Sequence, residues 1–334
     1  MIMQTTTQKR LPRYERAKTV NFRLQDRDIE IIREVYKYRF LNSDHISALV
    51  EGGRQGILRR LNLLFHAGYL DRPKAQRQIQ NQKMVYGLGN RGAEFLASEF
   101  DHDLSLADWT TKNREAGMVF LSHTLMVSNF IVMVRVACRR LKGLRYIEPE
   151  SIINQRPQPA RGTEQATNWK IEVQDERRRR TIGIIPDYVF GIYDEPAGRT
   201  FYYFLEADRS TMPIKRSVYG KSSFYKKLVG YYETCRQGQL PAFWGFKAAR
   251  ILTLTISRDR LLSMVNANRT LDSNGRGSNI FLFASESNFG LAEPSQVFNR
   301  IWTDGEGQKV SPLDSRDRHA IINEHGELIF FSAD

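Results

Sequence analysis

Three stretches of helical periodicity followed by two short strand-forming runs most strongly constrain how this chain can fold. Residues 26–40 place their apolar side chains on one helical stripe. Ser43 is a suitable N-cap for a short second helix. A third helix is expected over residues 54–66, and it ends near Gly68, a residue type that favours helix C-termini.

The two strand-forming runs, residues 69–71 and 84–88, flank a polar and basic stretch and predict a β-hairpin. Three helices and a hairpin in this order predict a winged helix-turn-helix over residues 24–100. A basic N-terminal arm, residues 1–23, precedes it. In this fold the third helix can enter the major groove of double-stranded DNA.

The predicted third helix and hairpin carry side chains that are suited to DNA. Arg reads guanine and Asn or Gln reads adenine in the major groove, whereas basic side chains on a wing hold phosphates. The alternative is a winged helix that contacts another protein. The candidate DNA-binding residues are Arg54, Gln55, Arg59, Arg60 and Asn62 on the helix, and Lys74, Arg77 and Lys83 on the wing.

The distribution of charge supports a polyanionic partner. The chain carries a formal net charge of +13 over 334 residues. Residues 1–90 hold 17 Lys and Arg against 8 Asp and Glu, whereas the rest of the chain holds 33 against 29. A basic excess concentrated in one domain favours nucleic acid as the partner, and a solvated basic surface is the alternative.

Composition excludes several other classes of protein. Two cysteines, Cys138 and Cys235, cannot form a disulfide framework or a cysteine-rich zinc site, and their scarcity indicates a reducing compartment. The most apolar stretch, residues 118–138, contains Ser, His, Asn and Arg and is too polar for a bilayer helix. No Walker motif is present, so ATP use is not expected. We therefore expect a soluble, cytoplasmic protein without membrane insertion.

A second domain is expected after an acidic, irregular boundary at residues 100–113. Residues 115–141 predict a long apolar core helix, and Ser257 caps a later helix that lies between two strand-forming runs. Strands mixed with helices are typical of an α/β sandwich, so the chain as a whole is expected to be α+β. The expected boundaries are residues 110–305 for the second domain and residues 306–334 for a C-terminal extension.

Residues 181–211 predict an antiparallel hairpin whose turn is Asp-Glu-Pro-Ala-Gly. A turn centred on residues 196–197 places Asp187 opposite Glu206, whereas a turn centred one residue later places Asp187 opposite Asp208. In either register the three carboxylates share one face of the sheet, because side chains on a strand alternate with period two.

Three carboxylates on one strand face repel one another unless a cation lies among them. Carboxylate oxygens are the ligands that Mg²⁺ and Mn²⁺ prefer. The hairpin therefore predicts a metal site made by Asp187, Glu206 and Asp208. Glu150, on a strand-like segment at residues 145–152, is a weaker candidate ligand. The alternative is a solvated face, or ion pairs with Arg209 and nearby lysines.

The order of short motifs around these carboxylates resembles a known family. Pro186-Asp187 is followed by Glu206-x-Asp208-Arg209-Ser210-Thr211 and then by Lys227-Leu228-x-x-Tyr231. With Ser-His-Thr-Leu at 122–125 and the predicted winged helix, this order is similar to the replication-relaxation family over residues 24–305. That family includes plasmid mobilisation relaxases of the MobC type. The resemblance implies a restriction-endonuclease-like PD-(D/E)xK fold, an acidic metal site, and a role in plasmid replication, DNA relaxation or transfer.

The chain departs from the nuclease pattern of that fold, which is Pro-Asp followed by Asp/Glu-x-Lys. Asp187 and Glu206 match the pattern, but Asp208 occupies the position of the lysine. In nucleases of this fold the lysine helps to orient or activate the attacking water. Lys227 in the following helix is our candidate for that role, and Lys221 and Lys226 are the alternatives.

Together these features predict a DNA-binding, Mg²⁺-dependent endonuclease, a relaxase-like nickase of plasmids or mobile elements. Asp187, Glu206, Asp208 and Lys227 are its expected catalytic residues. Among them, Asp208 is a further metal ligand or a hydrogen-bond acceptor behind the metal. The alternative is a non-catalytic replication or accessory factor, or a transcriptional regulator, with a degenerate nuclease fold. A second copy of the chain and other replication or mobilisation proteins are further expected partners.

Overall fold

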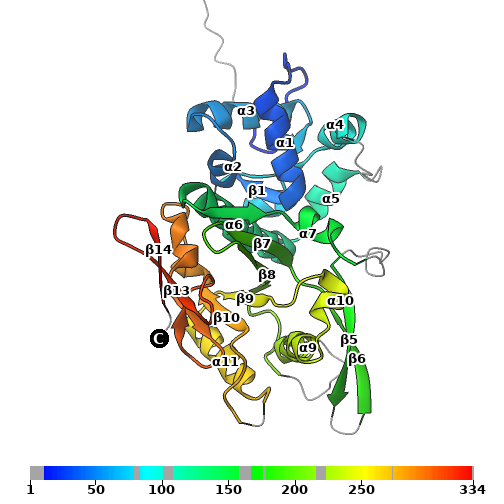
Figure 1. Cartoon of the computed structure of the whole chain (residues 1–334). Coiled ribbons are helices and arrows are strands. Elements are labelled where there is room, and N and C mark those ends of the chain that lie inside the picture. Colours follow the sequence, from blue (N-terminus) through cyan, green and yellow to red (C-terminus); the bar gives the residue numbers. More distant parts are fainter. Residues whose placement is uncertain are drawn as a thin grey trace, which may run out of the picture. The chain divides into compact units, whose positions relative to one another are not determined.

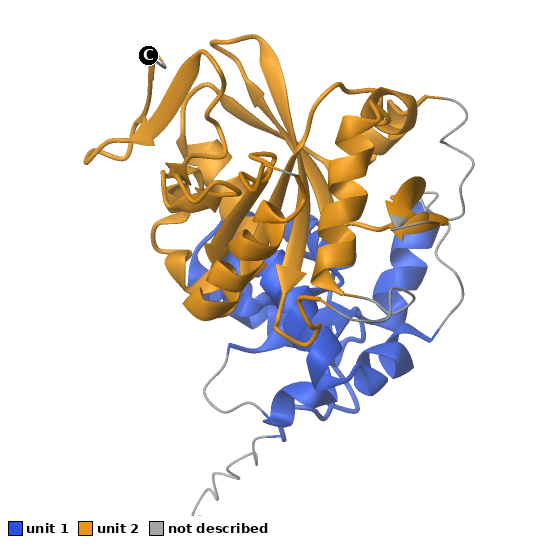
Figure 2. Ribbon diagram, turned by 90° about the horizontal axis from the view of Figure 1, so that it is seen from below, with its two compact units in different colours: residues 1–129 blue, residues 130–334 orange. Residues whose placement is uncertain are grey.

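The computed structural model describes residues 11–78, 83–100, 108–157, 167–175, 178–215, 223–272 and 274–332 (Figure 1). Helices and several sheets occur along the chain, so the expected mixed α+β class is confirmed. The chain divides into two compact units, residues 1–129 and residues 130–334 (Figure 2). Part of the predicted N-terminal arm, residues 1–10, and part of the predicted wing tip, residues 79–82, lie outside the described residues.

The first unit begins with helices and a small antiparallel sheet of strand order β1-β3-β2. Strands β2 and β3 pair as the expected hairpin, and β1 adds to its other edge. The elements are α1 (Asp26–Tyr38), β1 (Phe40–Asn42), α2 (Ser43–Leu49), α3 (Arg54–His66), β2 (Leu70–Asp71), the 3-10 helix η1 (Lys74–Gln78) and β3 (Val85–Leu88).

The core of this unit follows the apolar stripes of its helices. Ile32 and Val35 of α1 and Leu61 and Leu64 of α3 are fully or almost fully buried. The N-cap of α2 differs from the expectation, because Asn42 and not Ser43 caps the helix. The side chain of Asn42 accepts hydrogen bonds from the second and third residues of the helix, both at 2.9 Å. Ser43 is already the first helical residue.

Three more helices follow: α4 (Asn90–Phe100), α5 (Trp109–Glu115) and α6 (Met118–Arg140). Helix α5 corrects the expectation of an irregular segment over residues 100–113. Its cap, Asp108, accepts a hydrogen bond from the backbone N–H of Thr111 at 2.9 Å, and this local bond starts a helix that apolar periodicity does not reveal. Helix α6 corrects the expectation that this stretch is too polar for a bilayer helix. Among the described residues, it alone is long and apolar enough to cross a membrane, and 61% of its apolar window is buried inside the structure.

The second unit is built on a seven-stranded mixed sheet of strand order β12-β11-β10-β9-β8-β7-β4. Strands β8, β9 and β10 are parallel to one another, and the flanking strands pair antiparallel. The strands are β4 (Leu144–Ile147), β7 (Tyr188–Asp194), β8 (Arg199–Asp208), β9 (Arg250–Thr255), β10 (Phe281–Ser285), β11 (Trp302–Asp304) and β12 (Lys309–Val310).

Helices connect the parallel strands and cover one face of the sheet. Side chains of α9 and α11 join those of β8, β9 and β10 in one hydrophobic core cluster, which contains Phe204, Leu228, Ile251 and Met264. The connecting helices are α9 (Phe224–Arg236), α10 (Leu240–Trp244) and α11 (Arg258–Arg269). Ser257 accepts the backbone N–H of Arg260 at 3.2 Å, as expected for the cap of α11.

A two-stranded ribbon, β5 (Trp169–Asp175) and β6 (Arg178–Ile184), packs against α9 through its inward-facing side chains. An added Cβ at Gly230 of α9 would lie 3.0 Å from the side chain of Ile184, so glycine permits this close approach. The chain ends in 3-10 helices η2 (Glu286–Asn288) and η3 (Pro294–Phe298) and in an antiparallel pair, β13 (Arg318–Ile322) and β14 (Leu328–Ser332).

The strand-like segment expected at residues 145–152 is only partly a strand. Strand β4 ends at Ile147, and residues 149–154 form the short helix α7 (Pro149–Asn154). Proline is favoured at the first position of a helix and lacks the N–H that would continue a strand ladder. Glu150 is therefore an exposed helical residue, and its expected position on a strand is wrong.

Candidate functional site

The hairpin of β7 and β8 has the first of the two expected registers. Tyr188 pairs with Leu205 and Val189 with Phe204, which brings Asp187, the residue before β7, level with Glu206. The backbone N–H of Asp187 donates to the carbonyl of Leu205 at 3.0 Å. Its carboxylate accepts the backbone N–H of Ala207 at 2.8 Å. Two carboxylates that are 19 residues apart in the chain are thus held side by side by strand pairing.

Glu206 receives two partners from helix α9. Tyr231 donates its hydroxyl hydrogen to Oε1 of Glu206 at 2.6 Å, and the ammonium of Lys227 pairs with Oε2. Residues four apart on a helix lie on the same face, so one helix presents both groups to the carboxylate. Only 5% of the Glu206 side chain is exposed, compared with 35% of the Lys227 side chain. Of the candidate lysines, Lys227 is therefore placed at the carboxylate, while Lys221 lies outside the described residues.

Burial and charge shift the pKa values of all three groups. Burial raises the pKa of Glu206 to about 7; Lys227 opposes this shift and the charge of Asp187 adds to it. Burial alone would lower the pKa of Lys227, but the charges of Glu206 and Asp187 raise it above the ordinary value. Burial and the adjacent Glu206 also raise the pKa of Tyr231 well above its ordinary value.

Asp208 has a different partner from the other two carboxylates. The guanidinium of Arg260, on α11, donates to both of its oxygens, at 3.0 and 2.7 Å. The backbone N–H of Ser210 adds a third hydrogen bond at 2.7 Å. Over the described residues, no group of three or more His, Cys, Asp and Glu side chains is placed to hold a metal ion. We therefore do not retain Asp208 as a metal ligand in the proposal below.

A cavity of about 220 Å³ opens beside Glu206. Its walls are residues 182–185 of β6 and the adjoining loop, together with Met212, Ser223, Lys226 and Lys227. Mg²⁺ in proteins typically uses one or two carboxylates and completes its shell with waters and substrate oxygens. Asp187 and Glu206, side by side at the edge of the cavity, provide that donor set. The residues present therefore fit a divalent cation.

The candidate DNA-binding residues of α3 divide into exposed and engaged side chains. Gln55, Arg59 and Asn62 are exposed, although Oδ1 of Asn62 accepts a hydrogen bond from Arg72 at 2.9 Å. The guanidinium of Arg60 pairs with Asp28, whose carboxylate is completely buried. Arg60 therefore has a structural partner on α1, and we do not retain it as a DNA contact.

The basic residues of the hairpin lie on or near η1. Lys74 is exposed and forms no hydrogen bond or ion pair with another described residue. Arg77 lies over the ring of Tyr14 at 4.6 Å. Lys83 and Arg54 both approach Asp44, at 3.6 and 2.8 Å. Exposed ion pairs of this kind contribute little to stability.

Comparison with known proteins agrees with the order of motifs. A family model described as replication-relaxation matches residues 32–242. The chain belongs to the replication-relaxation family. The match contains Asp187, Glu206 and Lys227, whereas Arg260 lies beyond it. No curated protein and no solved structure matches this family member.

Two residues of the site received no role from the sequence. Tyr231 belongs to the motif Lys227-Leu228-x-x-Tyr231, and the spacing of four was a signal that both side chains share a helix face. Arg260 carried no such signal, because it is separated from Asp208 by 52 residues and lies in a helix without a recognisable motif. The family name associates this chain with replication and relaxation.

Proposed function

We propose that this replication-relaxation protein is a metal-dependent DNA endonuclease that nicks duplex DNA of a plasmid or mobile element. The observation that carries the proposal is the cluster of Asp187, Glu206 and Lys227 beside a cavity. Two adjacent carboxylates and an ammonium are the groups that a restriction-endonuclease-like site requires. The mixed sheet with helices on one face is consistent with that fold.

The proposed chemistry assigns one task to each side chain. Asp187 and Glu206 would hold Mg²⁺. When bound, the ion would polarise the scissile phosphate and lower the pKa of a bound water. Tyr231 holds one oxygen of Glu206 and so orients the other toward Lys227. Lys227 would leave Glu206 for the phosphate, where its charge stabilises the developing negative charge. Arg260 forms an ion pair with Asp208, the third carboxylate of the strand face.

The proposed DNA-recognition domain is the winged helix formed by α1, α2, α3 and the β2–β3 hairpin. The element order supports this proposal, as do the exposed Gln55, Arg59 and Asn62 on α3. Arg54, Lys74, Arg77 and Lys83 would contact phosphates, which position a protein without specifying sequence.

A second candidate function is a non-catalytic DNA-binding replication factor. It is favoured by Asp208, which occupies the position of the nuclease lysine and forms an ion pair with Arg260. In this alternative the pair of Lys227 and Glu206 is a structural ion pair that stabilises the packing of α9 on the sheet.

A cleavage assay distinguishes the two functions. Its substrate is supercoiled plasmid that carries the cognate replication or transfer region. The proposal expects open-circular product with Mg²⁺, none with EDTA, and none with Asp187→Asn or Glu206→Gln. Glu233→Gln is the matched control, because Glu233 is a carboxylate of the same helix α9 that pairs with Arg236 outside the site. Nicking that persists in Asp187→Asn and Glu206→Gln would reject these carboxylates as the metal site. Absence of nicking from the wild type would leave the replication factor as the function.

A further inference from the structure

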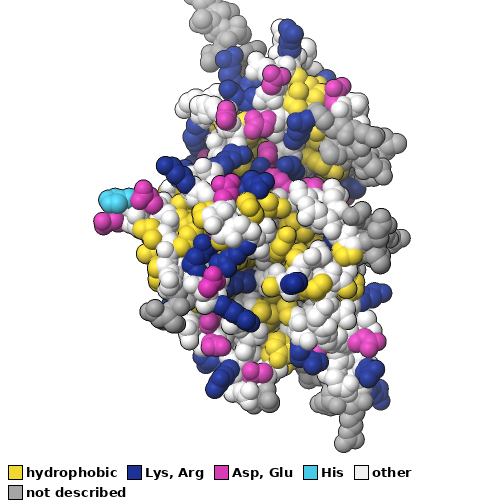
Figure 3. All heavy atoms as spheres, in the orientation of Figure 1, with side chains coloured by type: hydrophobic (Ala, Val, Ile, Leu, Met, Phe, Trp, Pro, Cys, Tyr) yellow, Lys and Arg dark blue, Asp and Glu magenta, His cyan; other side chains and the backbone are white. Residues whose placement is uncertain are grey.

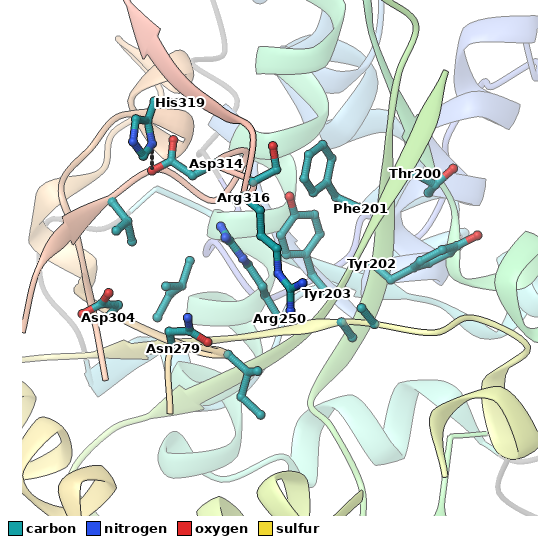
Figure 4. A pocket seen from close by; sticks show the side chains of 16 residues that line it. Thr200, Phe201, Tyr202, Tyr203, Arg250, Asn279, Asp304, Asp314, Arg316 and His319 are labelled. Atoms are coloured by element: carbon teal, nitrogen blue, oxygen red, sulfur yellow. Dashed lines mark ion pairs between the residues drawn. The ribbon is translucent and has the colours of Figure 1, made fainter. Parts of the chain in front are cut away.

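A second cavity, of about 490 Å³, lies in the second unit at the amino ends of β9 and β10 (Figure 4). Strand β9 pairs with β8 only from Tyr203 onward, so residues 200–202 of β8 extend past it and line the cavity. Residues between Asp304 and His319 close the other side. No residue is shared with the cavity beside Glu206, and most of this lining lies beyond the part of the chain that the family model matches.

Two arginines enter this cavity from opposite walls. Figure 4 shows the side chains of Arg250 and Arg316 passing each other near its centre, with their guanidinium groups pointing in opposite directions. Arg250 is held by two backbone carbonyls, those of Ser311 and Pro312, at 2.9 and 3.0 Å. Arg316 is exposed and forms no hydrogen bond or ion pair with another described residue. Lys and Arg side chains also gather near β13 on the face drawn in Figure 3.

The acidic residues of the cavity do not neutralise these two charges. Asp314 pairs with Arg300 at 2.6 Å, contacts His319 at 3.5 Å and accepts backbone N–H groups of Ser311 and Ala320. Asp304 accepts the N–H groups of its own turn, at 3.0 and 2.8 Å, and lies away from both arginines in Figure 4. The centre of the cavity is therefore positively charged.

The rest of the lining suits the body of a small organic molecule. Ile280, Leu282 and Val310 provide apolar surface, and Asn279 and Thr200 add polar groups at the edge. A volume of about 490 Å³ falls in the range of pockets that enclose small organic ligands.

We propose that this cavity binds a phosphate monoester of about the size of a mononucleotide. A phosphate monoester carries roughly two negative charges at neutral pH, which matches two guanidinium groups that no carboxylate occupies. Guanidinium groups bind phosphate oxygens through paired, charge-assisted hydrogen bonds. The apolar walls would hold the organic part of the ligand. This site is separate from the proposed nuclease site, and neither proposal depends on the other.

Thermal unfolding of the full chain in a concentration series of AMP, adenosine or inorganic phosphate tests the proposal. A ligand that binds only the folded protein raises its Tm. We expect AMP to raise the Tm of the wild type, phosphate to raise it less, and adenosine to leave it unchanged. In Arg316→Ala the apparent affinity for AMP should fall about tenfold or more, because a charge-assisted contact is lost.

Arg258→Ala is the matched control, since Arg258 is an exposed arginine of the same unit that follows the opposite end of β9. It should keep the wild-type response to AMP. Because Arg316 is exposed and unpaired within the described residues, its replacement should leave the ligand-free Tm unchanged. No response of the wild type to AMP, an equal response to adenosine, or an undiminished response in Arg316→Ala would overturn the proposal. Plasmid nicking by Arg316→Ala should equal that of the wild type, so the two sites are tested separately.

Discussion

Tyr231 donates a hydrogen bond to Glu206 at 2.6 Å, on the side of the carboxylate opposite to Lys227. The two donors come from one face of α9 and the acceptor comes from β8. Burial of a carboxylate is costly unless its oxygens have hydrogen-bond partners. The position of Glu206 in β8 is therefore stable only while α9 packs against the sheet. The same relationship places an ammonium beside the two carboxylates of the proposed metal site.

Tyr231→Phe should destabilise the protein by about 1–3 kcal/mol, because one oxygen of a buried carboxylate loses its donor. Urea unfolding at neutral pH measures the change. Tyr232→Phe is the matched control, since Tyr232 is the next residue on the same helix and is only partly buried. Equal losses in the two variants would show that the hydroxyl of Tyr231 has no special role.

The stability of the protein should decrease as pH rises through the titration of Glu206. The pKa of the buried carboxyl is about 7 in the folded protein, against an ordinary value of 4.5. Stability from the neutral form is therefore complete below pH 4.5 and is lost as pH rises through about 7. Urea unfolding across this range should show the decrease in the wild type, and Glu206→Gln should remove it. A Gln variant with the wild-type pH dependence would assign the effect to another group.

Arg260→Ala should destabilise the protein by about 3 kcal/mol or more, because it leaves the carboxylate of Asp208 buried without its cation. The Asp208 side chain is only 9% exposed. The double variant Asp208→Asn/Arg260→Ala should recover part of that loss, as a thermodynamic cycle from urea unfolding would show. If Asp187 and Glu206 bind Mg²⁺, the ion should raise the Tm of the wild type, because a ligand stabilises the state that binds it. Asp208→Asn should keep that rise, since Asp208 is not among the proposed ligands. Loss of that rise would return Asp208 to the metal site.

Replacement of Arg60 and of its neighbour Arg59 on α3 should have very different effects on the stability of the protein. Arg60→Ala should cost about 3–5 kcal/mol of stability, because Asp28 stays buried and unpaired. Arg59→Ala should change stability by less than about 0.5 kcal/mol, since Arg59 is exposed and has no partner among the described residues. Chemical denaturation of the two variants, without DNA, decides this prediction.

On DNA, Arg59→Ala should weaken binding to the cognate site by about 1–3 kcal/mol and binding to random duplex by much less. Lys74→Ala should weaken both about equally, because a phosphate contact carries no sequence information. Titrations of both duplexes at one salt concentration measure this difference. An equal loss on both duplexes for Arg59→Ala would reject its role in reading bases.

Local patterns determined a large part of this fold. The apolar stripes of residues 26–40 and 54–66 predicted α1 and α3, and the turn at residues 194–198 predicted the β7–β8 hairpin. The period of two along a strand put Glu206 and Asp208 on one face in either register, and both carboxylates do meet helices of that face. These features depend on residues that are close together in the sequence, so the amino-acid sequence alone predicts them.

Tertiary structure decided which partner each charged side chain has. Strand pairing selected the register that sets Asp187 beside Glu206, and packing of α11 on the sheet supplied Arg260 to Asp208 across 52 residues. Packing of α3 on α1 likewise gave Arg60 to Asp28. The sequence by itself showed where carboxylates and cations lie along the elements. Which of them form pairs could not be predicted from the sequence. A buried charge pairs with the group that packing places next to it, and that group is often far away in the sequence.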